Sequence, residues 1–264
     1  MRLPVLLYHH VGPVRPGANP FLTVSPSVFE VQIRYLVDKG YSTIQLAELA
    51  ARRYDRSVLP AKPVLITFDD GYADIAEFAL PLLRCYGFTA VVFLVTNYLG
   101  RTNFWQSETR GERLRLLGDK EVIKWSGEGM EFGSHSRSHP NLTKLSASQL
   151  QDEVMGSRAQ LKALFGYRPK AFAYPYGLVN GRVRDCVRAA FEYSFIVNNG
   201  FNSCRTDPWL MRRLEIVSGG GLFRFAWLMK LGFRSMRELR ERIAPRTRMR
   251  RWLAPDDRTR RHHQ

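Results

Sequence analysis

The segment Val64-Leu65-Ile66-Thr67-Phe68-Asp69-Asp70-Gly71 decides the fold class, because it joins an apolar strand directly to two adjacent carboxylates and a glycine. A continuous apolar run of this length is typical of a strand buried on both faces, as in a parallel sheet. Two carboxylates at the end of such a strand repel each other, so they need a proton or a cation between them when they are buried. The segment predicts an α/β fold with a polar site at a strand end.

Short β-branched runs alternate with stretches of helical period along the rest of the chain, which indicates parallel strands joined by helices. The predicted strands are Val5–His9, Val64–Phe68, Ala90–Val95, Glu131–Ser134, Ala171–Tyr174, Tyr193–Val197 and Arg213–Val217. Ser25-Pro26 predicts the start of a helix over Val28–Lys39, and the capping box Ser146–Gln149 predicts a helix that ends at Gly166. Seven strands predict a (β/α)7 barrel, with residues 1–218 as one domain and 219–264 as a helical, arginine-rich extension.

Composition excludes disorder throughout, since 45% of the 264 residues are hydrophobic and 24% are charged. The three cysteines, Cys85, Cys186 and Cys204, are odd in number and widely spaced. This spacing argues against a disulfide framework and against a thiolate zinc site, and it fits a reducing compartment. We therefore expect three buried free thiols.

No segment has the pattern of a secretory signal or of a membrane span. Met1–His10 has one basic residue and a very short apolar run, and Ala90–Val95 is far too short to cross a bilayer. We expect a soluble cytoplasmic protein.

Positive charge is concentrated near the carboxyl end of the sequence. The formal net charge is +16, and residues 223–264 contribute 13 Arg/Lys against 4 Asp/Glu. An apolar stretch over 222–231 precedes the arginine-rich run Arg246–Trp252, a pattern that fits an anionic membrane surface or nucleic acid. The alternative is a terminal helix packed on the domain and followed by a solvated tail. We expect the apolar part to pack and leave the tail open, with the inner membrane face favoured over nucleic acid.

The histidines are few and clustered, with four of six in the pairs His9-His10 and His135/His139. The second pair follows a predicted strand at i, i+4 spacing and can point both rings at one metal. One aspartate with two histidines forms a three-ligand set that leaves positions open for water and substrate, and the other aspartate is then free as a base. The alternative is a solvated Asp-Asp-Gly turn and two hydrogen-bonded surface histidines.

Three segments together resemble the polysaccharide deacetylases of the NodB-homology type. They are Thr67–Gly71, Gly133–Pro140 and Phe172–Gly177, and the resemblance extends from about Val5 to Val217. It implies a distorted (β/α) barrel and a divalent metal, usually zinc. It also implies roles for five site residues: Asp69 as general base, Asp70, His135 and His139 as metal ligands, and the backbone N–H of Tyr176 as an oxyanion donor.

The chain departs from the commonest pattern of that family at two positions. Ala173 stands where many members have an arginine that orients the base, and no late Leu-x-x-His motif follows. Leu7-Tyr8-His9 resembles a subgroup, including poly-N-acetylglucosamine deacetylases, in which the acid histidine comes from the first strand. His9 is therefore the expected acid, with His10 the less favoured neighbour. Arg213 could replace the missing arginine, with Arg212 as the alternative.

Substrate contacts are expected from the third motif and from the long stretch Asn97–Lys120, which lacks a clean period and is read as a loop over one rim or as a disordered insertion. The expected contact residues are Tyr174, Pro175 and Trp105. The resulting hypothesis is a metal-dependent hydrolase that removes an N-acetyl group from a sugar of an oligo- or polysaccharide or of a lipid-linked precursor, and releases acetate. For a cytoplasmic enzyme, a lipid-linked or nucleotide-linked sugar precursor is favoured over finished polymer. The alternatives are hydrolysis of another amide or of an O-acetyl ester, and a basic membrane-binding or nucleic-acid-binding module without activity.

Overall fold

A parallel sheet of eight strands, seven of them in one continuous order, forms the centre of the fold in the computed structural model, which describes residues 2–13, 21–49, 59–105, 113–219 and 221–233. In spatial order, the strands are β10 (Leu214–Glu215), β1 (Val5–Tyr8), β5 (Pro63–Phe68), β6 (Val91–Leu94), β7 (Glu131–Ser134), β8 (Ala171–Ala173) and β9 (Tyr193–Phe195). Each corresponds to one predicted strand. The sheet curls into a half-barrel, so the expected α/β barrel class is confirmed.

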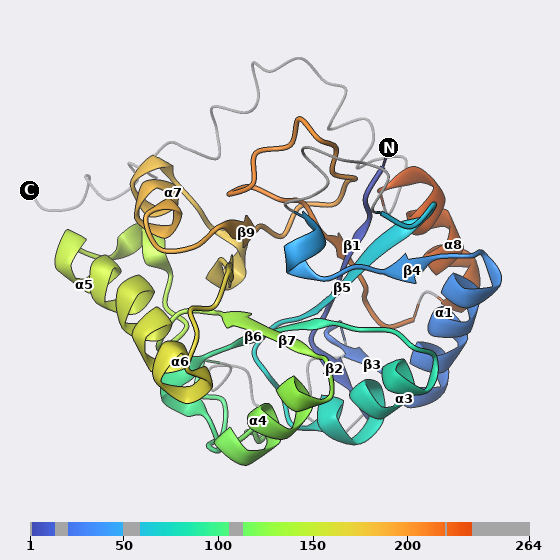
Figure 1. Cartoon of the computed structure of the whole chain (residues 1–264), viewed down its shortest axis with the longest axis horizontal. Coiled ribbons are helices and arrows are strands. Elements are labelled where there is room, and N and C mark those ends of the chain that lie inside the picture. Colours follow the sequence, from blue (N-terminus) through green and yellow to red (C-terminus); the bar gives the residue numbers. More distant parts are fainter. Residues whose placement is uncertain (1, 14–20, 50–58, 106–112, 220, 234–264) are drawn as a thin grey trace, which may run out of the picture.

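Helices surround the strands, which occupy the middle of the view in Figure 1. The α-helices are α1 (Pro26–Asp38), α3 (Leu80–Cys85), α4 (Asp119–Gly127), α5 (Ala147–Gln151), α6 (Ser157–Phe165), α7 (Gly181–Arg188) and α8 (Gly221–Leu231). Single turns of 3-10 or π type are η1 (Ile75–Ala79), η2 (Thr96–Tyr98), η3 (Leu142–Lys144), η4 (Asp152–Gly156) and η5 (Pro175–Gly177). Short strands β2 (His10–Val11) and β3 (Thr23–Val24) pair with each other, and β4 (Ser42–Thr43) pairs with β5.

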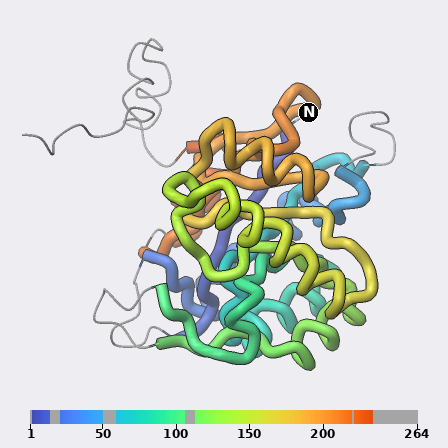
Figure 2. The backbone as a smooth tube through the Cα atoms, turned by 90° about the vertical axis from the view of Figure 1, so that its left-hand side faces the viewer, coloured from blue at the N-terminus to red at the C-terminus, as the bar shows by residue number. Residues whose placement is uncertain are grey.

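The helix limits follow the capping residues that the sequence offers. Ser25 caps α1 by accepting a hydrogen bond from the N–H of Val28, and Ser146 and Gln149 form a capping box at α5. Gly166 ends α6 at a φ of 76°, which favours glycine. Figure 2 shows α5, η4 and α6 as one continuous rod on the side that faces the viewer. The predicted helix is thus confirmed, with a π turn inside it.

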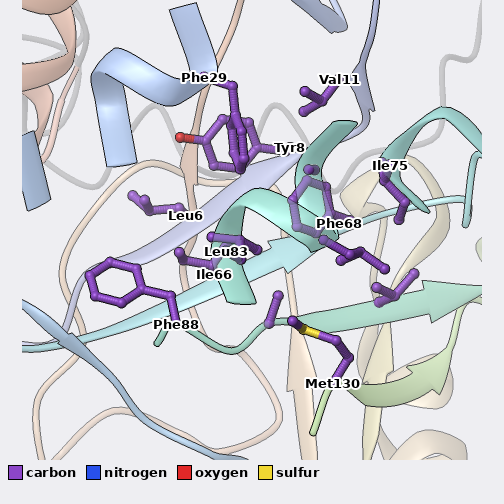
Figure 3. Close-up of a cluster of buried hydrophobic side chains, with 14 of the residues drawn as sticks. Leu6, Tyr8, Val11, Phe29, Ile66, Phe68, Ile75, Leu83, Phe88 and Met130 are labelled. Atoms are coloured by element: carbon purple, nitrogen blue, oxygen red, sulfur yellow. The ribbon is translucent and has the colours of Figure 1, made fainter. Parts of the chain in front are cut away.

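Strand alternation divides the buried side chains between the two faces of the sheet. Leu6 and Tyr8 point outward into a cluster beneath the helices, where Tyr8 lies against Phe29 and Phe68 at ring distances of 5.2 and 5.5 Å (Figure 3). Val5 belongs to a second cluster on the other face. Because successive residues of a strand face opposite ways, this alternation also sets the direction of the residues that follow β1.

Several expectations about surface and packing have clear outcomes. Cys85 and Cys204 are exposed and Cys186 is half-buried, so the expectation of three buried thiols is wrong; all three are free. Helix α8 packs on α1, with Phe225 edge-on to Tyr35 at 5.7 Å. The arginine-rich segment 234–264 lies outside the described residues. No helix in the part of the chain that the structure describes is long and apolar enough to cross a membrane.

Candidate metal and catalytic site

The strands β1 and β5 end side by side, which brings their following residues to one edge of the sheet. Tyr8 is paired with Phe68 in the parallel register, and the N–H of Asp69 donates to the carbonyl of Tyr8 at 2.9 Å. His9 and Asp69 are therefore neighbours, one residue beyond the paired ends. Since Tyr8 and Phe68 point outward, both of these side chains point to the concave face.

Asp70, His135 and His139 form a compact buried cluster. The Nε2 atoms of His135 and His139 lie 3.4 and 3.3 Å from Oδ1 of Asp70, and one ligand atom from each residue falls within 4.8 Å of the others. Each of the three side chains is at most 6% exposed. The ligand set expected from the sequence thus converges in space.

The hydrogen bonds around this cluster leave lone pairs facing its centre. Nδ1 of His135 lies 2.8 Å from the carbonyl oxygen of Ala173, which can only accept, so Nδ1 carries the proton and Nε2 presents a lone pair. Oδ1 of Asp70 is buried and has no hydrogen-bond partner. A buried carboxyl oxygen without a hydrogen-bond partner, placed beside two imidazole nitrogens of which that of His135 presents a lone pair, fits a divalent cation.

Burial shifts the pKa of the carboxyl group and the pKa values of the two imidazoles in opposite directions. Burial, together with the negative charge of Asp69, raises the pKa of Asp70 to about 8. Burial lowers the pKa values of His135 and His139, which keeps both imidazoles neutral and able to bind a metal. The site without a cation therefore holds a proton on Asp70 near neutral pH, and a divalent ion would replace that proton.

Arg213 is fully buried and forms a bidentate ion pair with Asp69. Its Nη1 and Nη2 donate to Oδ1 and Oδ2 of Asp69 at 2.6 and 2.7 Å, and its Nε donates to the carbonyl of Ile196 at 3.3 Å. Although burial raises the pKa of Asp69, the Arg213 guanidinium brings it down to about 2. Arg212 is exposed, so of the two candidates Arg213 is the one that lies beside Asp69.

His9 and His10 face opposite sides of the strand, as the period of two predicts. The ring of His10 lies tilted against that of Tyr72, with centroids 3.5 Å apart, and pairs through Nδ1 with Asp74 at 2.9 Å, on the side of the strand opposite to His9. Burial lowers the pKa of His9 to about 3, while the charge of Asp69 acts to raise it. His9 therefore lies within the electrostatic field of the cluster as a neutral imidazole, and His10 belongs to a separate group.

Aromatic rings cover the cluster on its open side. Trp105 stacks on His139 at 4.7 Å, and Tyr176 meets the same imidazole edge-on at 4.5 Å. Tyr176 is 52% exposed. These two rings present surface to a substrate next to the ligand cluster.

The expectation that Tyr174 contacts substrate does not agree with its placement. Its side chain is fully buried on the outer face of the sheet, and its hydroxyl donates to the carbonyl of Trp209 and accepts from the hydroxyl of Ser194. Pro175 is buried as well. Tyr174 shares the parity of Phe172 along β8, so it packs beneath α7 rather than in the half-barrel.

Four residues other than glycine have a positive φ among the described residues, and all four belong to the three motif segments. They are Asp70 at 70°, Ser136 at 67°, His139 at 59° and Tyr176 at 58°. Backbone in this region is unfavourable for side chains with a Cβ and is retained where the surroundings enforce it. The clustering marks these strand ends as the functional part of the molecule.

Two site residues were missed by the sequence reasoning. Tyr72 is fully buried, and its hydroxyl lies 3.4 Å from Nδ2 of Asn103, on the loop that also supplies Trp105. Glu153 accepts hydrogen bonds from the turn between His135 and His139. Tyr72 directly follows Asp70 and Gly71 in the sequence, so its closeness to the first motif could have marked it as a site residue. Glu153 lies in the interior of a predicted helix and offered none.

Comparisons with known proteins agree with this geometry. A family model described as polysaccharide deacetylase matches residues 56–193. The chain is 30% identical over 204 residues to a poly-beta-1,6-N-acetyl-D-glucosamine N-deacetylase of Staphylococcus aureus, covering 74% of this chain and 68% of that protein.

Solved structures share the fold. The deacetylase PplD of Streptococcus pyogenes, solved in complex with acetate, superposes with a TM-score of 0.75 at 24% identity, over 88% of this chain and 99% of that one. IcaB from Ammonifex degensii superposes with a TM-score of 0.72 at 23% identity, over 86% and 96% of the two chains. At these identities the likeness concerns the fold alone.

Proposed function

Because this chain belongs to the polysaccharide deacetylase family, we propose that it is a metal-dependent hydrolase that removes the N-acetyl group of an N-acetylated sugar and releases acetate. The observation that supports metal dependence is the buried cluster of Asp70, His135 and His139, in which Oδ1 of Asp70 has no hydrogen-bond partner. The similarity to a poly-N-acetylglucosamine deacetylase supports a glucosamine-type substrate. The proposed metal is zinc, since two imidazoles and one carboxylate suit it.

The proposed roles of the other residues follow from their positions. A divalent ion held by Asp70, His135 and His139 would polarise the acetyl carbonyl and lower the pKa of water there. Asp69 lies beside this cluster, 3.8 Å from Nε2 of His135, and is kept ionised by Arg213, so it can accept the proton of the attacking water. A carboxylate with so low a pKa binds that proton weakly and passes it on readily.

Two donors complete the proposed reaction. His9 lies beside Asp69 and enters the reaction neutral, so it must gain a proton before it donates one to the departing amine. The backbone N–H of Tyr176 is assigned to the developing oxyanion, since its residue lies against His139 and is held at a φ of 58°. The products are acetate and an amino sugar.

Metal analysis combined with substrate assays tests this proposal. The purified chain is expected to contain about one zinc ion and to release acetate from N-acetylglucosamine oligomers, and a chelator should abolish the release. An O-acetylated sugar and a cyclic amide serve as the alternative substrates. Faster turnover of either would replace the substrate part of the proposal, and chelator-resistant turnover would overturn the metal part.

We also propose that the enzyme works at an anionic membrane surface, which α8 contacts together with the basic segment that follows it. Phe223 is 82% exposed and lies 6.4 Å from the ring of Trp227. A hollow beside these rings is lined by Lys39, Lys62 and Lys230. Exposed aromatic rings ringed by lysines are suited to the interface of acidic lipids. We propose that the contact is made at the cytoplasmic face of the membrane.

A further inference from the structure

The turn between the two proposed metal ligands is held in an unfavourable conformation. It runs from His135 to His139, with Ser136 at a φ of 67° and His139 at 59°. A left-handed conformation costs each residue with a Cβ on the order of 1 kcal/mol, so the surroundings must supply the compensation. Without it, His139 would not be turned back toward Asp70.

Glu153 supplies three hydrogen bonds to this turn. Its Oε2 accepts from the backbone N–H groups of Arg137 and Ser138 at 2.8 and 2.9 Å, and its Oε1 accepts from the hydroxyl of Ser138 at 2.5 Å. Consecutive N–H groups that converge on one oxygen form an anion-binding nest, which here is filled by a carboxylate of the same chain. Hydrogen bonds to a charged acceptor are stronger than neutral ones.

The π turn η4 brings Glu153 to this position. A π turn inside an α-helix changes the direction of the side chains along it and is frequent at functional sites. The neighbours of Glu153 on the same turn also contact the histidine segment: Asp152 pairs with the guanidinium of Arg137, and Gly156 leaves room for that side chain, whose Cδ would lie 2.6 Å from an added Cβ. Ser157 continues the contact through the hydroxyl of Ser134 at 2.7 Å.

We infer that Glu153 is a positioning residue for the metal site: its carboxylate fixes the turn that places His139 Nε2 beside Asp70. The inference rests on the proposed metal dependence. Asp152 provides a matched comparison, since it lies on the same turn and bonds only to the half-buried side chain of Arg137, not to the backbone of the turn. Comparing variants at Glu153 and Asp152 therefore distinguishes an effect on the backbone of the turn from an effect on the packing of the helix against it.

The experiment measures zinc affinity of the metal-free full-length chain in competition with a chromophoric chelator. Glu153→Ala is expected to weaken zinc binding on the order of 10–100-fold, as is usual for partners that orient metal ligands. Glu153→Gln should lose less than about threefold, since its amide oxygen can accept both N–H groups while its NH₂ donates to the Ser138 hydroxyl. Glu153→Asp, one methylene too short, should resemble Glu153→Ala. Asp152→Ala should bind zinc as the parent does.

Circular dichroism of the metal-free proteins reports whether each variant is folded. If Glu153→Ala does not fold, the ranking of Glu153→Gln above Glu153→Asp decides. Equal zinc affinity in all three Glu153 variants and the parent would overturn the inference while leaving the metal site intact, as would an equal loss in Asp152→Ala. A parent chain that binds no zinc would overturn the proposed function and this inference together.

Discussion

Both carboxylate oxygens of Asp69 accept a hydrogen bond from the guanidinium of Arg213, a residue 144 positions later in the chain. The pair is almost completely buried, with side-chain exposures of 2% and 0%. The planar fork of arginine matches a carboxylate at two points, so it fixes the orientation of Asp69 as well as its charge. Asp69 therefore presents one defined face to the metal cluster.

Replacing Arg213 should impair both stability and catalysis. Arg213→Met leaves Asp69 as a buried charge without a partner, which typically costs about 3–5 kcal/mol of the free energy of unfolding. The pKa of Asp69 should rise, since burial acts to raise it and Arg213 opposes this. The acidic limb of the kcat/KM profile should therefore move to higher pH. Arg212→Met is the matched control and should change the free energy of unfolding by less than about 0.5 kcal/mol. An unshifted acidic limb in Arg213→Met would contradict this role.

Zinc affinity should rise with pH up to about 8. Metal binding must displace the proton that burial and Asp69 hold on Asp70, whose pKa is about 8, whereas the histidines are already neutral. Between pH 6 and 8 the logarithm of the affinity should increase by about one per pH unit, and above 8 it should level off. Competition titrations at several pH values measure this slope. A flat profile from pH 6 to 8 would show that Asp70 is ionised without the metal.

The same raised pKa predicts that the metal-free protein loses stability with increasing pH. A carboxyl whose pKa is higher in the folded state stabilises the fold fully below its unfolded pKa of 3.8 and loses this contribution as pH rises through about 8. Asp70→Asn cannot ionise, so without metal it should be more stable than the parent at pH 8, by several degrees in Tm. The difference should shrink at pH 5. A lower Tm for Asp70→Asn at pH 8 would refute it.

The two adjacent aspartates should respond differently to the same substitution. Asp69→Asn removes a base and should abolish turnover while leaving zinc content nearly intact, whereas Asp70→Asn removes a ligand and should lose both. Metal analysis and acetate release on the same preparations distinguish the two outcomes. Equal loss of metal from the two variants would mean that the roles are misassigned.

Side-chain direction along the strands was the most informative property that the sequence contained. It correctly separated His9 from His10, and the same parity would have placed Tyr174 with Phe172 on the outer face, where the structure has it. Parity does not help outside a strand. Arg213 lies just before β10, where the period of two does not apply. Which of Arg212 and Arg213 faces Asp69 therefore depends on loop contacts, such as the hydrogen bond from Nε of Arg213 to the carbonyl of Ile196.

Positions set by helix irregularity were beyond prediction for a different reason. The segment from Ser146 to Phe165 has one apolar face and correct caps, and both features are the same with or without a π turn. In the structure, Glu153 lies on this π turn and bonds to the histidine turn. Local sequence rules predict the helix and its ends, but they do not predict that Glu153 faces the turn between His135 and His139.

The α8 surface should contribute to membrane binding. Phe223→Ala combined with Trp227→Ala should weaken sedimentation with vesicles of acidic phospholipid on the order of tenfold at low salt, since both rings then lose their interfacial contacts. Acetate release from a small soluble substrate should stay unchanged. Ile123→Ala on α4 removes an apolar side chain of intermediate exposure, 52% against 82% for Phe223 and 37% for Trp227, and serves as the control. Deleting residues 246–264 should also reduce vesicle binding. Binding that persists in the double variant and in the deletion would show that neither α8 nor the basic segment makes the membrane contact.

His9 is the site residue whose role depends most on the register of β1. Leu6 and Tyr8 lie in the outer cluster, so His9 turns to the concave face beside Asp69, and His10 turns outward to Asp74. Burial keeps the imidazole of His9 neutral at rest while the charge of Asp69 acts to raise its pKa, so His9 must gain a proton during the reaction before it can give one to a poor leaving group. An amine needs this proton, whereas an activated aryl oxide does not.

His9→Ala should therefore reduce the rate of N-acetyl hydrolysis by about 10²–10⁴, with a much smaller loss on an activated aryl acetate. The comparison of the two substrates isolates proton donation, because a general disturbance of the site would slow both. His10→Ala is the matched neighbour and should slow neither selectively, since its ring pairs with Asp74 and stacks on Tyr72. If His10→Ala shows the selective loss and His9→Ala does not, the register is wrong by one. If neither does, the proton comes from another group and the place of this chain in the first-strand histidine subgroup fails.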